Sequence, residues 1–483
     1  MYIGLDLGTS GIKALLIDDK QQIIGSTHAG IKVLRPHAGW SEQNPDEWIA
    51  ACEIAIEQLR INHPKEFAAT ESISFSGQMH GATLLDESGK VLRPCILWND
   101  TRSHAQAARL DSDPLFRQLS GNIVFPGFTA PKLCWVEEHE KSLFSRVAKV
   151  LLPKDYLRFW LTGDYVSDMS DAAGTSWLDV AGRCWSSQLL EKSGMRLEQM
   201  PNLVEGSQAS GQLRPELAGR WGFAKSPIVG GGAGDNAASA IGMGVVNQGQ
   251  AFLSLGTSGV IFAATDGYKP MPESAVHAFC HALPNTWHQM GVILSATDAL
   301  NWYAGIAGQP AATLSQALGD KAKNPSKVRF LPYLSGERTP HNDAQIRGAF
   351  VGLEHQTSQQ DLTQAVLEGV SFAIRDNLEA LRSAGTELQS VVAVGGGSRS
   401  DFWLQTLANA LNLTVERPKD GDFGAAFGAA RLAQLAVSSE SAASLLTTPE
   451  IETRFEPENV SAYEDTYQHY RSVYPALTGL ARS

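Results

Sequence analysis

The chain has 483 residues, 43% hydrophobic and 19% charged, so it can bury a large core and is long enough for two or three domains. Its formal net charge of -12 argues against nucleic acid or an anionic membrane as a partner, because both repel an acidic surface. Five scattered cysteines without CxxC spacing predict reduced thiols. The sequence shows neither a basic leader nor a run of about 18 apolar residues, and we therefore expect a cytoplasmic protein.

The N-terminal stretch predicts a β-hairpin. Residues 3–7 and 12–17 are apolar runs, and the turn between them is Gly-Thr-Ser-Gly. The backbone N–H groups of this turn, the Ser10 hydroxyl and the nearby Lys13 ammonium are suitable partners for phosphate oxygens. An ordinary polar turn is the alternative.

A helix and a short loop follow in the first half of the chain. Asn44 is the predicted N-cap of the helix and Pro45 its first residue. A strand over 72–76 then leads into Gly-Gln-Met-His-Gly, a tight loop that places Met79 and His80 where they can contact a small polar ligand. A purely structural histidine is the alternative.

The stretch 226–244 predicts a strand, a glycine-rich turn and a small-residue helix. Asp235 and Asn236 stand where that helix begins. Open α/β sheets bind ligands at the carboxyl ends of their strands, so Asp235 is a candidate functional carboxylate. The alternative is an aspartate that only caps the helix.

The pentapeptide Leu-Gly-Thr-Ser-Gly at 7–11 recurs at 255–259, about half a chain length later. This repeat predicts two halves of related build, each with a hydroxyl-bearing turn that includes Thr257 in the second copy. Asp6 precedes the first turn and Ser254 the second, so only the first half offers a carboxylate for a metal ion.

The second half predicts two further ligand-facing loops. In the loop over 330–341, Gly336 and Arg338 are placed to approach a nucleotide, or Glu337 and Arg338 simply pair. A strand over 391–394 is followed by a glycine run that includes Gly396, then by Ser400 and a helix, which is typical of a nucleotide site. From 438 on, helices are expected, with four tyrosines as a packing face: Tyr463, Tyr467, Tyr470 and Tyr474.

Together these motifs resemble the FGGY family of carbohydrate kinases. The resemblance runs from the N-terminus to about residue 430, and SGQMHG and the SGERTPH loop are its most specific parts. The motifs are DLGTSGIK at 6–13, SGQMHG at 76–81, LWND at 97–100, GGGAGDN at 230–236, LSLGTSG at 253–259, LPYLSGERTPH at 331–341 and VGGGSRS at 394–400.

The resemblance implies an α/β fold with two actin-like (ribonuclease H-like) domains that flank a catalytic cleft. Residues 1–245 are expected to form the sugar-binding domain and residues 246–437 the nucleotide-binding domain, with 438–483 as a helical tail packed on both. A homodimer is compatible with this organisation.

The family roles carry over by position. Asp235 is implied as the general base, and Asp6 as the residue that orients Mg²⁺ through water. The sugar-binding set is Met79, His80, Asp235 and Asn236, and the set that binds ATP is Ser10, Lys13, Thr257, Gly336, Gly396 and Ser400.

The implied reaction transfers the γ-phosphoryl group of Mg-ATP to the terminal hydroxyl of D-xylulose, a step of D-xylose catabolism. The alternative substrates are ribulose, 1-deoxy-D-xylulose, gluconate and glycerol, of which glycerol is disfavoured because glycerol kinases carry Arg-Glu in place of Met79 and His80. A different class, an ATP-gated binding protein of the actin or Hsp70 type, shares the DLGTS turn but has no use for the GQMHG loop.

Overall fold

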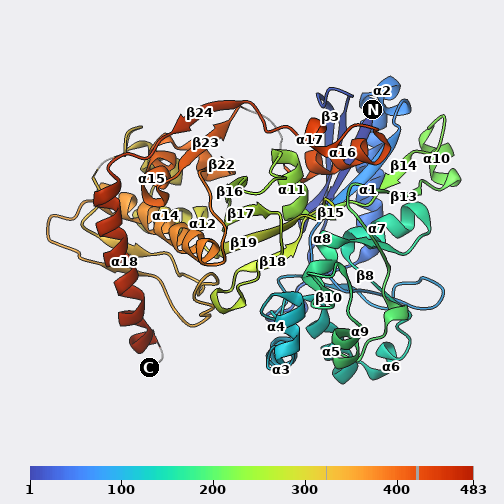
Figure 1. Ribbon diagram of the computed structural model, residues 1–483, viewed down its shortest axis with the longest axis horizontal. Helices are drawn as coiled ribbons and strands as arrows, with labels where there is room; N and C mark the ends of the chain where they lie inside the picture. The colour runs from blue at the N-terminus through green and yellow to red at the C-terminus, as the bar shows by residue number, and fades with distance from the viewer. Residues whose placement is uncertain (323, 420–423, 482–483) are drawn as a thin grey trace.

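The computed structural model describes residues 1–322, 324–419 and 424–481, which form two lobes (Figure 1). Each lobe is built on a seven-stranded mixed sheet. The first sheet has the order β13-β14-β5-β1-β2-β3, with β15 beside β5, and the second has the order β18-β19-β17-β16-β22-β23-β24.

The strands of the first sheet are β1 (Tyr2–Leu7), β2 (Gly11–Ile17), β3 (Ile23–Gly30), β5 (Ser72–Gly77), β13 (Ala209–Gln212), β14 (Ile228–Gly230) and β15 (Ala233–Gly234). Those of the second are β16 (Ala251–Leu255), β17 (Gly259–Thr265), β18 (His277–Cys280), β19 (Trp287–Ile293), β22 (Ser390–Val394), β23 (Thr414–Pro418) and β24 (Ile451–Phe455). Shorter strands outside these sheets are β4 (Glu42–Gln43), β6 (Thr83–Leu85), β7 (Cys95–Ile96), β8 (Lys149–Leu151), β9 (Val166–Asp168), β10 (Leu178–Asp179), β11 (Cys184–Trp185), β12 (Asn202–Val204), β20 (Arg329–Leu331) and β21 (Ala349–Val351).

The helices of the first half are α1 (Pro45–Asn62), α2 (Pro64–Ala68), α3 (His104–Asp111), α4 (Pro114–Ser120), α5 (Thr129–His139), α6 (Lys141–Phe144), α7 (Pro153–Thr162), α8 (Met169–Ala172), α9 (Ser187–Lys192), α10 (Pro215–Trp221) and α11 (Asp235–Met243). Those of the second half are α12 (Thr297–Ala307), α13 (Ala311–Gln316), α14 (Gln359–Ser383), α15 (Asp401–Leu411), α16 (Ala425–Val437), α17 (Ala442–Leu445) and α18 (Val460–Ala481). The predicted cap of α1 is confirmed, because the Asn44 side chain accepts from the Asp46 backbone N–H and Pro45 opens the helix.

The repeat in the sequence corresponds to a repeat in topology. In the first sheet β1, β2 and β3 form an antiparallel meander, and β5 joins β1 in parallel. In the second sheet β16, β17 and β19 form the equivalent meander, and β22 joins β16 in parallel. Each copy of the pentapeptide forms the turn between the first two strands, as predicted. The chain therefore has two domains of related build.

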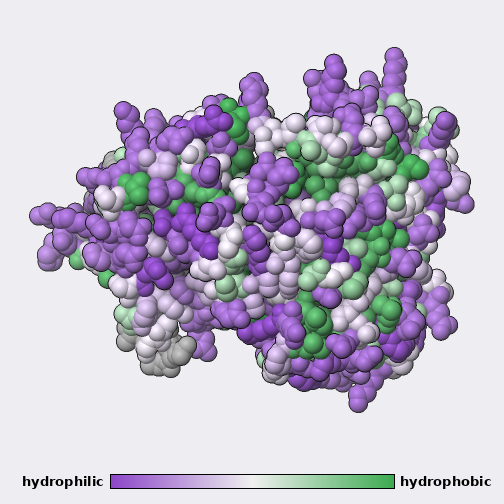
Figure 2. Space-filling model, in the orientation of Figure 1, coloured by the Kyte–Doolittle hydropathy of each residue, from purple (hydrophilic) through white to green (hydrophobic). Residues whose placement is uncertain are grey.

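Each sheet carries its own hydrophobic core. In the first domain Leu5 and Ile73 of the sheet pack with Trp48 and Ile56 of α1. In the second, α14 lies against the sheet, and its buried residues and those of α15 form one cluster with β16 and β22. The face shown in Figure 2 is mostly hydrophilic, with small separate hydrophobic patches.

Helix α16 packs on the first domain, although it follows most strands of the second sheet in the sequence. It lies against β1, β5 and α11 of the first domain (Figure 1), and the Ser72 hydroxyl donates to the Ala433 carbonyl at 2.6 Å. Close approach is possible because small residues face each other. A Cβ added at Gly428 would lie 1.7 Å from the Ala238 carbonyl oxygen, and one at Gly4 would lie 2.1 Å from that of Ala426. The last helix of residues 246–437 thus packs on the first domain instead of on its own sheet.

The tail also differs from the expected run of helices. Residues 451–455 form β24, an edge strand antiparallel to β23. Ile451, Thr453 and Phe455 are more buried than the charged residues between them, and this alternation has the period of a strand, which accounts for the difference. The helical parts of the tail are α17 and α18. Of the four tyrosines predicted as a packing face, Tyr463, Tyr467 and Tyr470 are buried and Tyr474 is half-buried.

Within the described residues, every helix is too short or too polar to cross a bilayer. All five cysteines are free thiols, as predicted, and only Cys184 is exposed.

We expect Gly428→Ala to destabilise the protein by about 1–3 kcal/mol, because the added methyl group forces α16 away from α11. Gly305→Ala is the matched control: it also lies in a helix, nothing stands within 4 Å of its added Cβ, and alanine should stabilise it by about 1 kcal/mol. Urea unfolding of both variants measures the difference. Equal stabilities would show that the contact between α16 and α11 is not close.

Candidate functional site

Three parallel strand ends meet at one edge of the first sheet. β5 lies between β1 and β15, and both Asp6 and Ala233 are opposite Ser76. Since these strands run in the same direction, the residues that follow them come together at their carboxyl ends. Asp6, the loop after β5 and Asp235 therefore share this edge.

Asp235 is the first residue of α11, and Gly234 holds the N-cap position, so Asp235 is not the helix cap. Its Oδ1 accepts from the Asn236 backbone N–H at 2.8 Å and from Asn236 Nδ2 at 3.0 Å. Burial raises the pKa of Asp235 to about 7, with a further contribution from the negative charge of Asp6. The side chain is only half-buried. An accessible carboxyl with this pKa is suited to accept a proton from an alcohol at neutral pH.

His80 is held rigidly in the loop after β5. Its φ of 69° lies in the left-handed region, and its carbonyl accepts from Lys132 Nζ at 2.8 Å and from Thr129 Oγ1 at 3.1 Å. Its ring stacks on Phe128 at 4.6 Å, and its Nδ1 lies 2.7 Å from the Gly174 carbonyl oxygen. Burial lowers the pKa of His80 to about 3, so the ring is neutral. Because a carbonyl oxygen can only accept a hydrogen bond, Nδ1 carries the ring proton and donates the hydrogen bond to Gly174, and Nε2 is left as an acceptor.

Met79 connects this loop to the turn before Asp235. It is 6% exposed, and a Cβ added at Gly234 would lie 2.9 Å from its sulfur. The loop and the carboxylate are therefore packed against each other.

The first glycine turn is tied to the same loop. The Thr9 hydroxyl donates to Gln78 Oε1 at 2.9 Å and accepts from Trp98 Nε1 at 3.0 Å. Ser10 is exposed at the tip of the turn, and Lys13 lies opposite Asp6 in the β1–β2 pairing. The turn thus presents a hydroxyl and a lysine beside Asp6.

The second turn has the same exposed character. Thr257 is exposed, and its carbonyl accepts from the Ala296 backbone N–H at 2.8 Å. The Thr297 hydroxyl donates to the Gly256 carbonyl at 2.8 Å, so the N-terminus of α12 fixes the turn.

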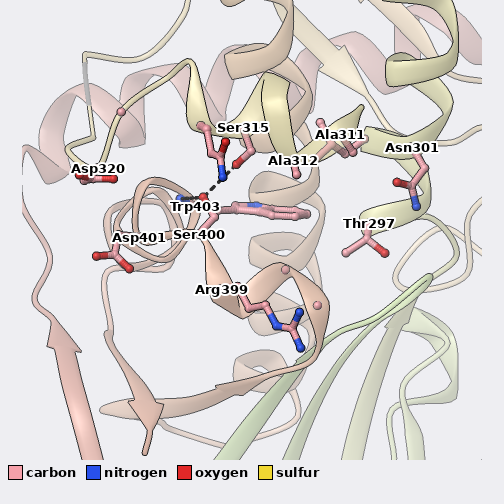
Figure 3. A pocket seen from close by; sticks show the side chains of 15 residues that line it. Thr297, Asn301, Ala311, Ala312, Ser315, Asp320, Arg399, Ser400, Asp401 and Trp403 are labelled. Carbon is pink, nitrogen blue, oxygen red and sulfur yellow. Dashed lines mark hydrogen bonds between the residues drawn. The ribbon is translucent and has the colours of Figure 1, made fainter. Parts of the chain in front are cut away.

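A cavity of about 760 Å³ lies beside this turn in the second domain (Figure 3). Gly396 and Ser400 line it, and a Cβ at Gly396 would meet nothing within 4 Å. The Ser400 hydroxyl caps α15 and lies 3.1 Å from that of Ser315. The other lining residues come mainly from α12, α13 and α15: Thr297, Leu300, Asn301, Ala311, Ala312, Ser315, Gln316, Gly319, Asp320, Gly397, Arg399, Asp401 and Trp403.

A second cavity of about 540 Å³ connects this region to the first domain. It shares Gly396 and Arg399 with the first cavity and is also lined by Asn236 and Ser239 of α11. The space beside the glycine run thus extends to the helix that begins with Asp235.

Gly336 and Arg338 do not line the large cavity. Gly336 has φ +86°, and its Cβ would meet the Asp343 carbonyl oxygen at 2.8 Å, inside its own loop. The Arg338 guanidinium lies 5.0 Å from the ring centroid of Phe125, in the first domain, and its charge contributes to the low pKa of His80. Arg338 therefore lies near the loop of Met79 and His80, and the approach of Gly336 to a nucleotide stays a prediction.

The alternative for this loop, an ion pair between Glu337 and Arg338, is not among the ion pairs of the described residues. Glu337 is 3% exposed and accepts instead from the backbone N–H groups of Arg338 and Leu294, at 2.7 and 3.1 Å. Burial raises its pKa to about 8.

Three residues that contact His80 were not predicted from the sequence. Phe128 and Gly174 fix the His80 ring, and Lys132 fixes its carbonyl. Lys132 could have been noticed in the sequence, because it is a lysine among the mostly apolar residues of helix α5. Phe128 and Gly174 gave no such signal, because only the fold brings them to His80.

Asp6 has the chemistry for a magnesium site. Mg²⁺ commonly binds one or two carboxylates together with substrate phosphates and water. The described part of the chain contains no group of three or more His, Cys, Asp or Glu side chains arranged to hold a metal ion. Asp6 lies beside the first glycine turn and close enough to Asp235 to raise its pKa, and this arrangement fits an ion that arrives with a nucleotide.

Family models match both halves of the chain. Residues 1–242 match the N-terminal domain of the FGGY family of carbohydrate kinases, and residues 251–437 match its C-terminal domain. A xylulose kinase from Escherichia coli is 47% identical over 99% of this chain and 100% of its own length. One from Klebsiella pneumoniae is 49% identical over 91% of both chains.

The fold has a solved counterpart as well. The crystal structure of a xyloylose kinase from Brucella ovis superposes with a TM-score of 0.98, at 63% identity and over 99% of both chains. Because both family domains are matched and these relatives cover nearly the whole chain, the chain belongs to the FGGY family of carbohydrate kinases and is an ATP-dependent sugar kinase.

Proposed function

We propose that the protein transfers the γ-phosphoryl group of Mg-ATP to the terminal hydroxyl of D-xylulose and forms D-xylulose 5-phosphate. The relatives above, named as kinases of this sugar, support the choice of substrate. The observation that carries the chemistry is the position of Asp235, whose pKa is raised to about 7 where three strand ends meet beside the nucleotide-sized cavities.

Asp235 acts as the general base. Phosphoryl transfer has a loose transition state, so it depends more on positioning and charge neutralisation than on a strong base. Asp235 therefore orients the attacking hydroxyl and accepts its proton late in the reaction. The two hydrogen bonds from Asn236 hold the carboxylate in place for this role.

The phosphates lie between the two glycine turns. Ser10 and Thr257 offer exposed hydroxyls from opposite domains, and Lys13 supplies positive charge. Asp6 would hold Mg²⁺ through water, and the bound ion would neutralise charge on the phosphates. Gly396 and Ser400 receive the nucleoside in the large cavity.

Residues 1–245 hold the sugar and residues 246–437 most of the nucleotide. His80 Nε2 accepts from a sugar hydroxyl, Met79 forms the apolar wall and Asn236 contributes its amide. Closure of the two domains excludes water, which would otherwise hydrolyse ATP. A homodimer and a cytoplasmic location remain predictions.

In a coupled assay of ADP release from Mg-ATP, D-xylulose should stimulate turnover far more than D- or L-ribulose, 1-deoxy-D-xylulose, gluconate or glycerol. Asp235→Asn should lower kcat by about 10²–10⁴-fold, because the base is lost, with little change in KM. Asp465→Asn, on the exposed face of α18, is the matched control and should leave kcat unchanged. A preference for another ketose would contradict the assignment of D-xylulose as the substrate. Wild-type turnover by Asp235→Asn would contradict the assignment of Asp235 as the general base.

The activity should also fall as the pH drops through about 7. Only the ionised carboxylate accepts a proton, and burial raises the pKa of Asp235, so the active form is present above that pKa and is lost below it. A plot of kcat/KM for D-xylulose against pH measures the apparent pKa below which activity is lost. An apparent pKa near 4, the ordinary value of a carboxyl group, would contradict the raised pKa of Asp235.

A further inference from the structure

A buried group of four charged side chains lies in the first domain and takes no direct part in the proposed reaction. Lys154 Nζ lies 2.5 Å from Asp155 Oδ1, 2.7 Å from Asp168 Oδ1 and 3.2 Å from Asp171 Oδ2. The lysine side chain is 1% exposed and the three carboxylates are 0% exposed. We call these four residues the Lys154 cluster.

The Lys154 cluster is costly to bury, because one ammonium faces three carboxylates. Burial raises the pKa of Asp155 and of Asp171, so protons held on these groups reduce the imbalance. Apolar side chains would fill the same space with less desolvation, and a buried ionic group of this kind is therefore a candidate for a functional constraint.

One arm of the cluster leads to the turn before Asp235. The Ser170 hydroxyl donates to Asp168 Oδ2 at 2.5 Å and accepts from the Gly234 backbone N–H at 3.1 Å. Asp168 also accepts from the backbone N–H of Ser170 at 2.8 Å, which fixes the start of α8. Lys154, Asp168, Ser170 and Gly234 thus form a continuous chain that ends one residue before Asp235.

A second contact supports the sugar loop. Gly77 packs against Lys154 so closely that an added Cβ would lie 2.9 Å from the lysine Cβ. Gly77 is also the residue opposite Gly234 in the pairing of β5 and β15. The backbones that lead into Met79–His80 and into Asp235 therefore both rest on the Lys154 cluster.

We propose that the Lys154 cluster is a positioning device for the active site and that Ser170 is the residue through which it sets the backbone before Asp235. The inference rests on the proposed function, since the carboxylate that it positions is the proposed base. Ser170 acts through Gly234 and touches no substrate. Its loss leaves a buried N–H without an acceptor at the turn that aims Asp235.

Ser170→Ala tests the inference. We expect kcat with D-xylulose to fall about tenfold or more while KM for ATP stays within about twofold, because the carboxylate is misplaced and the nucleotide cavity is untouched. Ser170→Thr keeps the hydroxyl and should recover most of the lost kcat. Amide hydrogen exchange at Gly234 should become faster in Ser170→Ala, which gives a readout independent of activity.

Ser120→Ala is the matched control, because its buried hydroxyl donates at 2.7 Å to the Phe116 carbonyl of its own helix. We expect this control to keep kcat and the exchange rate at Gly234. An equal kcat in the two alanine variants, or unchanged exchange at Gly234 in Ser170→Ala, would overturn the inference. A wild-type protein without D-xylulose-dependent ADP release would instead overturn the proposed function.

Discussion

The parallel pairing of β5 with β1 on one side and β15 on the other is the constraint on which the site depends. It brings Asp6, the loop of Met79 and His80, and Asp235 to one edge, although they are far apart in the chain. The proximity has an electrostatic effect, because the charge of Asp6 adds to burial in raising the pKa of Asp235. A shift of register in these strands would separate the candidate base from the candidate metal ligand.

The two domains meet through more than the cleft. Helix α16 belongs to the second half of the sequence but packs on the first sheet and on α11. Arg338 reaches from the second domain to Phe125 in the first, near His80. Both contacts lie beside residues of the site: α11 begins with Asp235, and the charge of Arg338 contributes to the low pKa of His80.

Local signals predicted much of the fold. The cap of α1, the hairpin turns and the repeated pentapeptide depend on neighbouring residues, and the structure has all three as expected. The packing of α16 on the first domain depends on contacts between distant segments, which periodicity does not encode. The alternation over 451–455 is a local signal for a strand, and only the pairing of β24 with β23 depends on a distant segment. In the site, the position of Arg338 beside Phe125 could not be predicted from the sequence, because it depends on how the loop folds and on a residue of the other domain.

The most direct measurement is a crystal structure with D-xylulose and a non-hydrolysable ATP analogue. We expect the terminal hydroxyl of the sugar within about 2.6–3.2 Å of the Asp235 carboxylate, beside His80, and the adenine in the cavity lined by Gly396 and Ser400. A closed complex in which that hydroxyl lies away from Asp235, or in which the nucleotide occupies another site, would contradict the proposed arrangement.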